Sequence, residues 1–198
     1  MPVTINGDGS ITGLAVGGLP DGSVDADTLA SNAVTTVKIA DGAATATKVA
    51  AGSVIKFQNT KGPASNQNVN VNQSWTTLTG TVVDFTPTFS NSKLDLNWVF
   101  ALENQGGTDG IGFRIYRQSP IGGSDTLIHE NYQHSHWSTS ASQWTGPGQI
   151  YLHHVDSPGV NTAVRYFVQA YKEQGNNMYI NYGNDDDGIQ MTIREVKV

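Results

Sequence analysis

Apolar residues recur at every fifth position across the first quarter of the chain. A period of five matches neither the 3.6-residue period of a packed helix nor the two-residue period of a strand. One apolar residue in five buries too little surface to offset the ordering entropy of a single chain, so we expect identical copies to supply the rest. The positions in phase are Leu14, Leu19, Val24, Leu29, Val34, Ile39, Ala44, Val49 and Val54.

The repeat also indicates a local conformation. Thr-Lys-Ile-Ala-Asp-Gly ends at Gly42 and Thr-Lys-Val-Ala-Ala-Gly ends at Gly52, while Asn32 holds the same place one unit earlier. Glycine and asparagine tolerate left-handed backbone, so each unit is predicted to be a short helical turn ended by a left-handed residue and followed by an extended link. The alternative is a disordered Ala/Thr/Gly linker, and the regular phase from residue 14 to 54 favours the repeat.

From Ser53 onward the pattern changes to the two-residue alternation of strands. Leu94, Leu96 and Trp98 alternate with Asp95 and Asn97, which places the apolar side chains on one face of a strand. Many short strands without an amphipathic helix predict an antiparallel β-sandwich that is jelly-roll-like, so the chain is mainly β. The predicted strands are 54–58, 75–85, 93–102, 112–118, 126–129, 148–154, 164–171, 177–182 and 189–196.

Composition narrows the possible functions. The 198 residues carry a net charge of −6 and no cysteine. The acidic balance argues against nucleic-acid binding, and without cysteine there is neither a disulfide framework nor a thiolate metal site. No signal peptide or apolar run long enough to span a bilayer is visible, so we expect release by cell lysis if the protein acts outside cells.

Two short motifs could bind metal. His134 and His136 have the i, i+2 spacing that puts both rings on one side of a strand, and three copies on a symmetry axis would offer six imidazoles to a transition metal. The alternative is a polar surface loop, which we favour. Residues 184–188 (Asn-Asp-Asp-Asp-Gly) lack the ligand spacing of a calcium loop and are predicted to be a solvated hairpin tip.

The segment 132–151 is a candidate for sugar recognition. Aromatic faces flanked by short polar side chains bind sugars by stacking and hydrogen bonding. The same indoles could instead cover the end of the sandwich or lie in a subunit interface. The four candidate ligand-binding residues are Tyr132, Trp137, Trp144 and Tyr151.

Catalysis finds little support in the sequence. No nucleophile elbow, phosphate-binding loop or zinc-protease motif is present. Acidic residues are scattered, so a carboxylate pair for glycoside hydrolysis cannot be placed. We therefore expect no enzymatic activity and no required cofactor.

The chain resembles the tail-fibre and virion fibre (spike) proteins of bacteriophages. The resemblance is carried by the opening ING-DGSITGLAVGGLPDGSV with its KIADGA-type repeats, by TPTFSNSKLDL at 86–96, by VDSPGVNTAVRYFVQAY at 155–171 and by MTIREV at 191–196. It implies an intertwined homotrimer on the exterior of the phage particle. Its parts would be a virion anchor at 1–21, a decad-repeat stem at 22–52 and a β head at 53–198.

The phase of the repeat predicts that Asp25, Lys38 and Lys48 face solvent in such a stem. The head would recognise a host-surface glycan. The brevity of the repeat favours a short spike on tail, neck or capsid. A purely structural decoration protein and a polysaccharide-degrading tailspike are the alternatives. The residues expected to face the three-fold axis or a neighbouring chain are Val24, Leu29, Val34, Ile39, Val49 and Val54.

Overall fold

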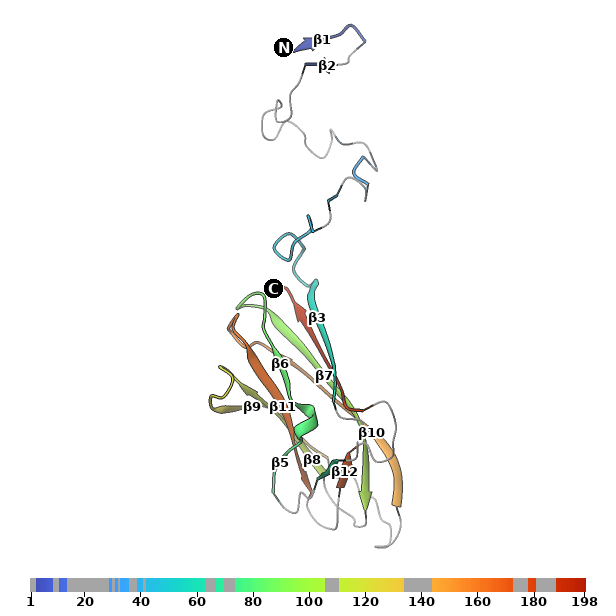
Figure 1. Cartoon of the computed structure of the whole chain (residues 1–198), viewed down its shortest axis with the longest axis vertical. Coiled ribbons are helices and arrows are strands. Elements are labelled where there is room, and N and C mark those ends of the chain that lie inside the picture. The colour runs from blue at the N-terminus through green and yellow to red at the C-terminus, as the bar shows by residue number, and fades with distance from the viewer. Residues whose placement is uncertain are drawn as a thin grey trace. The chain divides into compact units, whose positions relative to one another are not determined.

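The computed structural model of the chain divides into two compact units, residues 1–45 and 46–198 (Figure 1). In the first unit, β1 (Thr4–Ile5) pairs antiparallel with β2 (Ile11–Thr12). None of the helices in the described ranges is long and apolar enough to cross a membrane. The structure describes residues 3–8, 11–13, 29, 31, 33–35, 39–40, 42–62, 67–69, 74–105, 111–133, 144–172, 178–180 and 188–198.

The repeat has the backbone conformation predicted for its glycines. Gly42 has φ 77° and Gly52 has φ 86°, and the Ala43 amide closes a turn on the Ala40 carbonyl at 2.9 Å. The left-handed conformation at both glycines is therefore confirmed. Asn32, Val24, Asp25 and Lys38 lie outside the described residues.

Most of the described apolar positions of the repeat are exposed in the single chain, whereas Val49 is half-buried. The exposed fractions are 45% for Leu29, 55% for Val34 and 48% for Ile39. Surface of this kind gains stability only when something covers it. Their expected contact with neighbouring chains stays a prediction.

The second unit begins with a six-stranded antiparallel sheet centred on β7 (Lys93–Gln105). One edge of β7 pairs along its length with β10 (Trp144–Asp156). The other edge pairs first with β13 (Gln190–Val196) and then with β12 (Met178–Ile180), which are flanked by β3 (Val54–Lys61) and β4 (Gln67–Val69) respectively.

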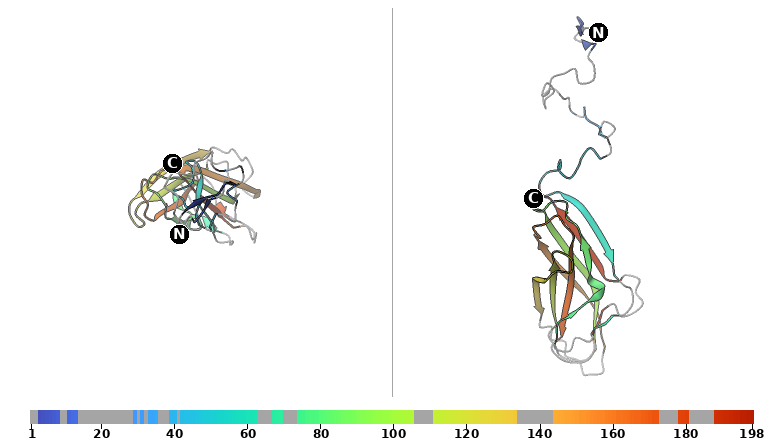
Figure 2. Two further views of the ribbon diagram at one scale, coloured as in Figure 1. Left: turned by 90° about the horizontal axis from the view of Figure 1, so that it is seen from above. Right: turned by 60° about the vertical axis from the view of Figure 1, so that its left-hand side comes forward.

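A five-stranded antiparallel sheet forms the other layer. Its order is β5 (Thr76–Thr77), β11 (Val164–Lys172), β8 (Ile111–Gln118) and β9 (Asp125–Gln133), with β6 (Val83–Phe85) pairing the start of β11. The single-turn 3₁₀ helix η2 (Thr79–Thr81) joins β5 to β6. Figure 2 shows these strands from two further sides. The prediction of an antiparallel β-sandwich is confirmed.

The apolar core lies between the two sheets. Alternate residues of β7, β11 and β13 point inward and are almost fully buried, as their two-residue pattern predicts. Trp98 donates its indole N–H to the Thr81 carbonyl at 3.1 Å, so η2 is tied to the facing sheet. The fully buried core residues with the largest side chains include Trp98, Tyr166, Phe85, Phe100, Leu78, Leu94, Leu96, Ile115, Ile180 and Ile189.

Two buried carboxylates hold polar parts of the sandwich in place. Asp156 on β10 accepts hydrogen bonds from Arg117 at 2.8 and 2.9 Å and from the Tyr166 hydroxyl at 2.8 Å, both on the five-stranded sheet. Burial, with the Asp156 charge beside it, raises the pKa of Tyr166 far above its ordinary value. Glu195, fully buried, accepts from the Thr88 and Phe89 amides and from the Thr88 and Ser92 hydroxyls.

Residues 75–85 depart from the sequence prediction of one long strand. They form β5, η2 and β6 instead, because buried Thr81 makes bonds that a continuous strand could not make. Its hydroxyl donates to the Leu78 carbonyl at 2.6 Å and accepts from the Val168 amide at 2.9 Å. The segment therefore pairs with β11 at two separate places, first through β5 and then through β6.

The last repeat unit lies against the end of the head. The Gly52 amide donates to the Lys197 carbonyl at 2.7 Å, and the Lys197 amide donates to the Ser53 carbonyl at 3.0 Å. The Lys197 ammonium donates to the carbonyls of Thr47 and Val49 at 2.8 and 2.6 Å. The C-terminal segment thus fixes the chain where it enters β3 (Figure 1).

A candidate binding face on the five-stranded sheet

The outer face of the five-stranded sheet, here called the five-strand face, combines aromatic and polar side chains. Phe167 on β11 points outward between its outward neighbours Arg165 and Gln169, yet it is only 5% exposed. Its ring stacks on Tyr116 of β8 with centroids 5.5 Å apart and planes within 11°. Tyr116 and the neighbouring polar side chains therefore hold the Phe167 ring in place and cover most of it.

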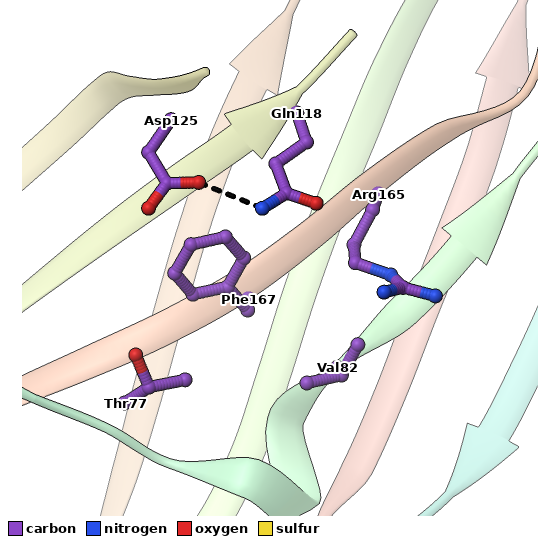
Figure 3. A pocket seen from close by; sticks show the side chains of 6 residues that line it. All are labelled: Thr77, Val82, Gln118, Asp125, Arg165 and Phe167. Carbon is purple, nitrogen blue, oxygen red and sulfur yellow. Dashed lines mark hydrogen bonds between the residues drawn. The ribbon is translucent and has the colours of Figure 1, made fainter. Parts of the chain in front are cut away.

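A pocket of about 240 Å³ lies beside Phe167, which forms part of its lining. Figure 3 shows the Phe167 ring between Thr77 on one side and Gln118 and Asp125 on the other. Gln118 donates to Asp125 at 2.8 Å and accepts from the Gly122 amide at 3.2 Å, so its amide orientation is fixed at both ends. The full lining is Thr77, Val82, Gln118, Asp125, Arg165 and Phe167.

Charge at this pocket is balanced by an ion pair. Arg165 binds Asp84 of β6 through two parallel bonds of 2.7 and 2.8 Å, the bidentate geometry that orients a guanidinium. The hydrogen bond from Arg165 lowers the pKa of Asp84 despite its partial desolvation. Because both side chains keep contact with water, the pair positions the guanidinium more than it stabilises the fold.

A second aromatic cluster continues the same face toward the end of β11. The Arg114 guanidinium lies 3.9 Å from the centre of the Trp75 ring and also binds Glu130 at 3.2 Å. Trp75 contacts Tyr171 with centroids 5.2 Å apart. The five-strand face therefore carries two aromatic platforms, each with an arginine held in place by a carboxylate.

The sequence-predicted ligand residues lie elsewhere. Tyr132 is near the end of β9 in the five-stranded sheet, whereas Trp144 and Tyr151 are on β10 in the six-stranded sheet. Tyr151 is 68% exposed and hydrogen-bonds Gln149. Trp137 lies outside the described residues. The strand β10 begins at Trp144, so this tryptophan belongs to a strand and not to the loop expected from the sequence.

The predicted histidine motif cannot be located in the described part of the chain, because His134 and His136 lie outside it. Within the described ranges, no three His, Cys, Asp or Glu residues are grouped to hold a metal ion. Two other histidines do meet: His129 of β9 stacks on His154 of β10 with centroids 5.1 Å apart. Burial, followed by the nearby His129, lowers the pKa of His154.

The sequence pattern does not predict the pocket residues, because pairing of strands that are distant in the sequence brings them together. Arg165 aligns with Asp84 on one neighbouring strand and with Gln118 on the other, and Gln118 aligns with Asp125. One local signal was present. Phe167 sits among the polar residues of an alternating strand, where an aromatic side chain marks an outward platform.

Comparisons with known proteins do not assign a family. No known family model matches the sequence, and no curated protein matches it. Among solved structures, Eiger TNF from S. frugiperda is similar at 9% identity over 63% of this chain and 91% of that chain, with a TM-score of 0.37. The VP2 subviral particle of infectious bursal disease virus gives 10% identity over 72% of this chain and 38% of that chain, with a TM-score of 0.39. Likenesses this distant carry no functional argument.

Proposed function

We propose that the chain is a homotrimeric structural spike on the exterior of a bacteriophage particle. Residues 1–21 attach it to other virion proteins, residues 22–52 form the three-chain stem, and the β head recognises a glycan on the host surface. The five-residue repeat supports the trimer, because its exposed apolar positions need cover from other chains. The role is adhesive and includes no catalytic step.

The pocket beside Phe167 is the observation that carries the recognition role. A sugar can contact the Phe167 side chain in this lining while its hydroxyls bond to fixed polar groups, here Gln118, Asp125 and Arg165. At about 240 Å³ the pocket is smaller than the roughly 300–1,000 Å³ of drug-sized sites, which suits a single sugar residue. Three such weak sites on one spike would gain avidity from their linkage.

A glycan-binding assay with the full chain tests this role. We expect Arg165→Gln and Trp75→Ala to weaken binding to a host-surface polysaccharide roughly tenfold or more, as loss of one polar or stacking contact does. The matched control is Lys48→Gln, which removes one exposed positive charge that lies outside both sheets. Equal binding by all variants, or no binding by the wild type, would argue against glycan recognition by this face.

A decoration protein without a host receptor is the second candidate. The repeat supports it because it spans only residues 22–52, which makes a stem too short to extend far from the particle surface. Deletion from the phage separates the two roles. Lost adsorption with few copies at the tail supports recognition, whereas normal adsorption with copies across the shell supports decoration.

A further inference from the structure

The outer face of the six-stranded sheet, here called the six-strand face, has a different character. Aligned residues of β3, β13, β7 and β10 form rows across it, because antiparallel partners share a face. One row is Phe57, Arg194, Asp95 and Val155. On β7, β10 and β13 the outward residues are exposed or half-buried, whereas their neighbours are buried or half-buried toward the other sheet; every described residue of the edge strand β3 is exposed or half-buried.

Exposed apolar side chains gather at the two margins of this face. Val54 and Phe57 lie on β3, with Phe57 59% exposed, and Tyr151 and Val155 lie on β10, with Tyr151 68% exposed. Between these margins the side chains are mostly polar, with half-buried Val99 and Val196 among them. Two apolar margins on opposite sides of one face fit a heterologous ring contact, in which one margin of each subunit meets the other margin of its neighbour.

The charged groups in the middle of the face are already paired. Asp95 accepts from Arg194 at 3.1 Å and bonds to His153 at 2.8 Å. A partner could therefore cover the face without leaving this carboxylate unpaired, which is the costly outcome when charges are buried. The exposed Lys61 and Lys93 lie toward its ends, where interface rims are charged.

The partner that fits is a second copy of this chain. Val54 is both an in-phase position of the repeat and the first residue of β3, and Lys197 holds the end of the repeat beside it. If three stems wind together, the Val54 end of each head is brought next to two others. The face measures on the order of 500 Å² by strand spacing and rise, below the roughly 800 Å² per partner of a stable interface, so the stem would supply the remainder.

We propose that the six-strand face is the contact surface between heads, with the β3 margin of one copy packed against the β10 margin of the next. This inference rests on the trimer in the proposed function. The glycan-binding face then points away from the contact on every copy, because it lies on the other sheet. The β3 margin of one copy then faces the β10 margin of its neighbour, and Phe57 lies level with Val155 in this contact.

Cysteine cross-linking of the full chain tests the contact directly, since the natural chain has no cysteine. Phe57 and Val155 of one copy are three strand spacings apart, about 14 Å, too far for a disulfide within that copy. We expect Phe57→Cys combined with Val155→Cys to give covalent dimers and trimers on oxidation or with a short bismaleimide. Either substitution alone should leave single chains on denaturing gels.

Light scattering of the wild type separates the two proposals. A trimer whose double-cysteine variant stays uncross-linked would overturn the contact and leave the spike standing. A monomer would overturn both. Dimers formed equally well by one single-cysteine variant would show a two-fold contact and contradict the ring.

A second measurement does not depend on cross-linking geometry. Phe57→Ser together with Tyr151→Ser should raise the trimer dissociation constant by roughly tenfold for each residue, while the secondary structure by circular dichroism stays unchanged because both side chains are exposed. Ile121→Ser is the matched control, an exposed apolar residue in the turn between β8 and β9. Equal dissociation constants for all three proteins would overturn the proposal.

Discussion

Both outer faces of the sandwich are built from antiparallel strands, but they differ in how far each buries an outward-pointing phenylalanine. Phe167 on the five-strand face is almost buried, because Tyr116 stacks on it and polar side chains surround it. Phe57 on the six-strand face is 59% exposed on the edge strand β3. Contacts within one chain already bury Phe167, which lines a pocket. Phe57 keeps exposed apolar surface that a second molecule could cover. This difference is the reason why we propose ligand binding at the five-strand face and contact between copies at the six-strand face.

The largest expected effect on stability comes from removing the hydrogen bonds that join the two sheets at Asp156. Asp156→Ala leaves the Arg117 guanidinium without its carboxylate and the buried Tyr166 hydroxyl without its acceptor. Breaking such a buried pair costs about 3 kcal/mol. Urea unfolding followed by tryptophan fluorescence measures the loss. Asp125→Ala, at an exposed carboxylate, is the control, and a loss of less than about 1 kcal/mol from Asp156→Ala would contradict this role.

The second prediction compares the two phenylalanines directly. Phe167→Ala should lower the free energy of unfolding by about 2 kcal/mol at any protein concentration, since its contacts lie within one chain. Phe57→Ala should cost less than about 0.5 kcal/mol in a dilute sample. Its cost should grow with concentration if the six-strand face joins copies, because association stabilises the folded state by mass action. Thermal melts over a hundredfold range of protein concentration measure this difference. If the melting temperatures of both variants change with concentration in parallel, the distinction between the two faces is wrong.

Local alternation was enough to predict which residues of β7 and β13 point inward. Each side chain's direction follows from its place in a two-residue pattern, so Leu94, Leu96 and Trp98 could be assigned to the core before any partner strand was known. The left-handed conformation of the repeat glycines could likewise be predicted from local sequence. Their left-handed backbone depends on the missing Cβ and on nothing distant.

The pocket could not be found in this way. It needs the register of four strands, and the break of residues 75–85 into β5, η2 and β6 depends on Thr81 reaching Val168, which is distant in sequence. The sequence pattern predicts one strand over the whole segment because no neighbouring residue indicates the break. Long-range hydrogen bonds outweigh β propensity at this point.

A smaller effect is expected from pH at the edge where the two sheets meet. Burial lowers the pKa of His154, so the unfolded chain takes up a proton more readily than the folded chain. Stability should therefore fall as the pH drops below the ordinary value of 6.5, and the loss should end below the lowered pKa. His129 and His153 oppose protonation of His154, and Asp156 favours it.

Melting temperatures from pH 7.5 to 5 check this dependence. His154→Gln keeps a polar side chain that does not titrate, so its melting temperature should fall less over the same range. His153→Gln removes the weakest of the influences on the pKa of His154 and keeps His154 itself, so its melting temperature should still fall with pH nearly as in the wild type. If the wild type and His154→Gln lose stability in parallel, His154 is not the group that responds.

The smallest expected effect lies on the five-strand face itself. Arg165→Ala breaks the Asp84 ion pair, which water screens, so the loss of unfolding free energy should be small and should shrink at high salt. Because Arg165 lowers the pKa of Asp84, the contribution is present above the ordinary value of 3.8 and is lost as the pH falls through the lowered one. Wild type and variant should therefore converge in acid. A large, salt-independent loss would mean that Arg165 holds the fold, and weaker glycan binding by its variants could no longer be assigned to the pocket.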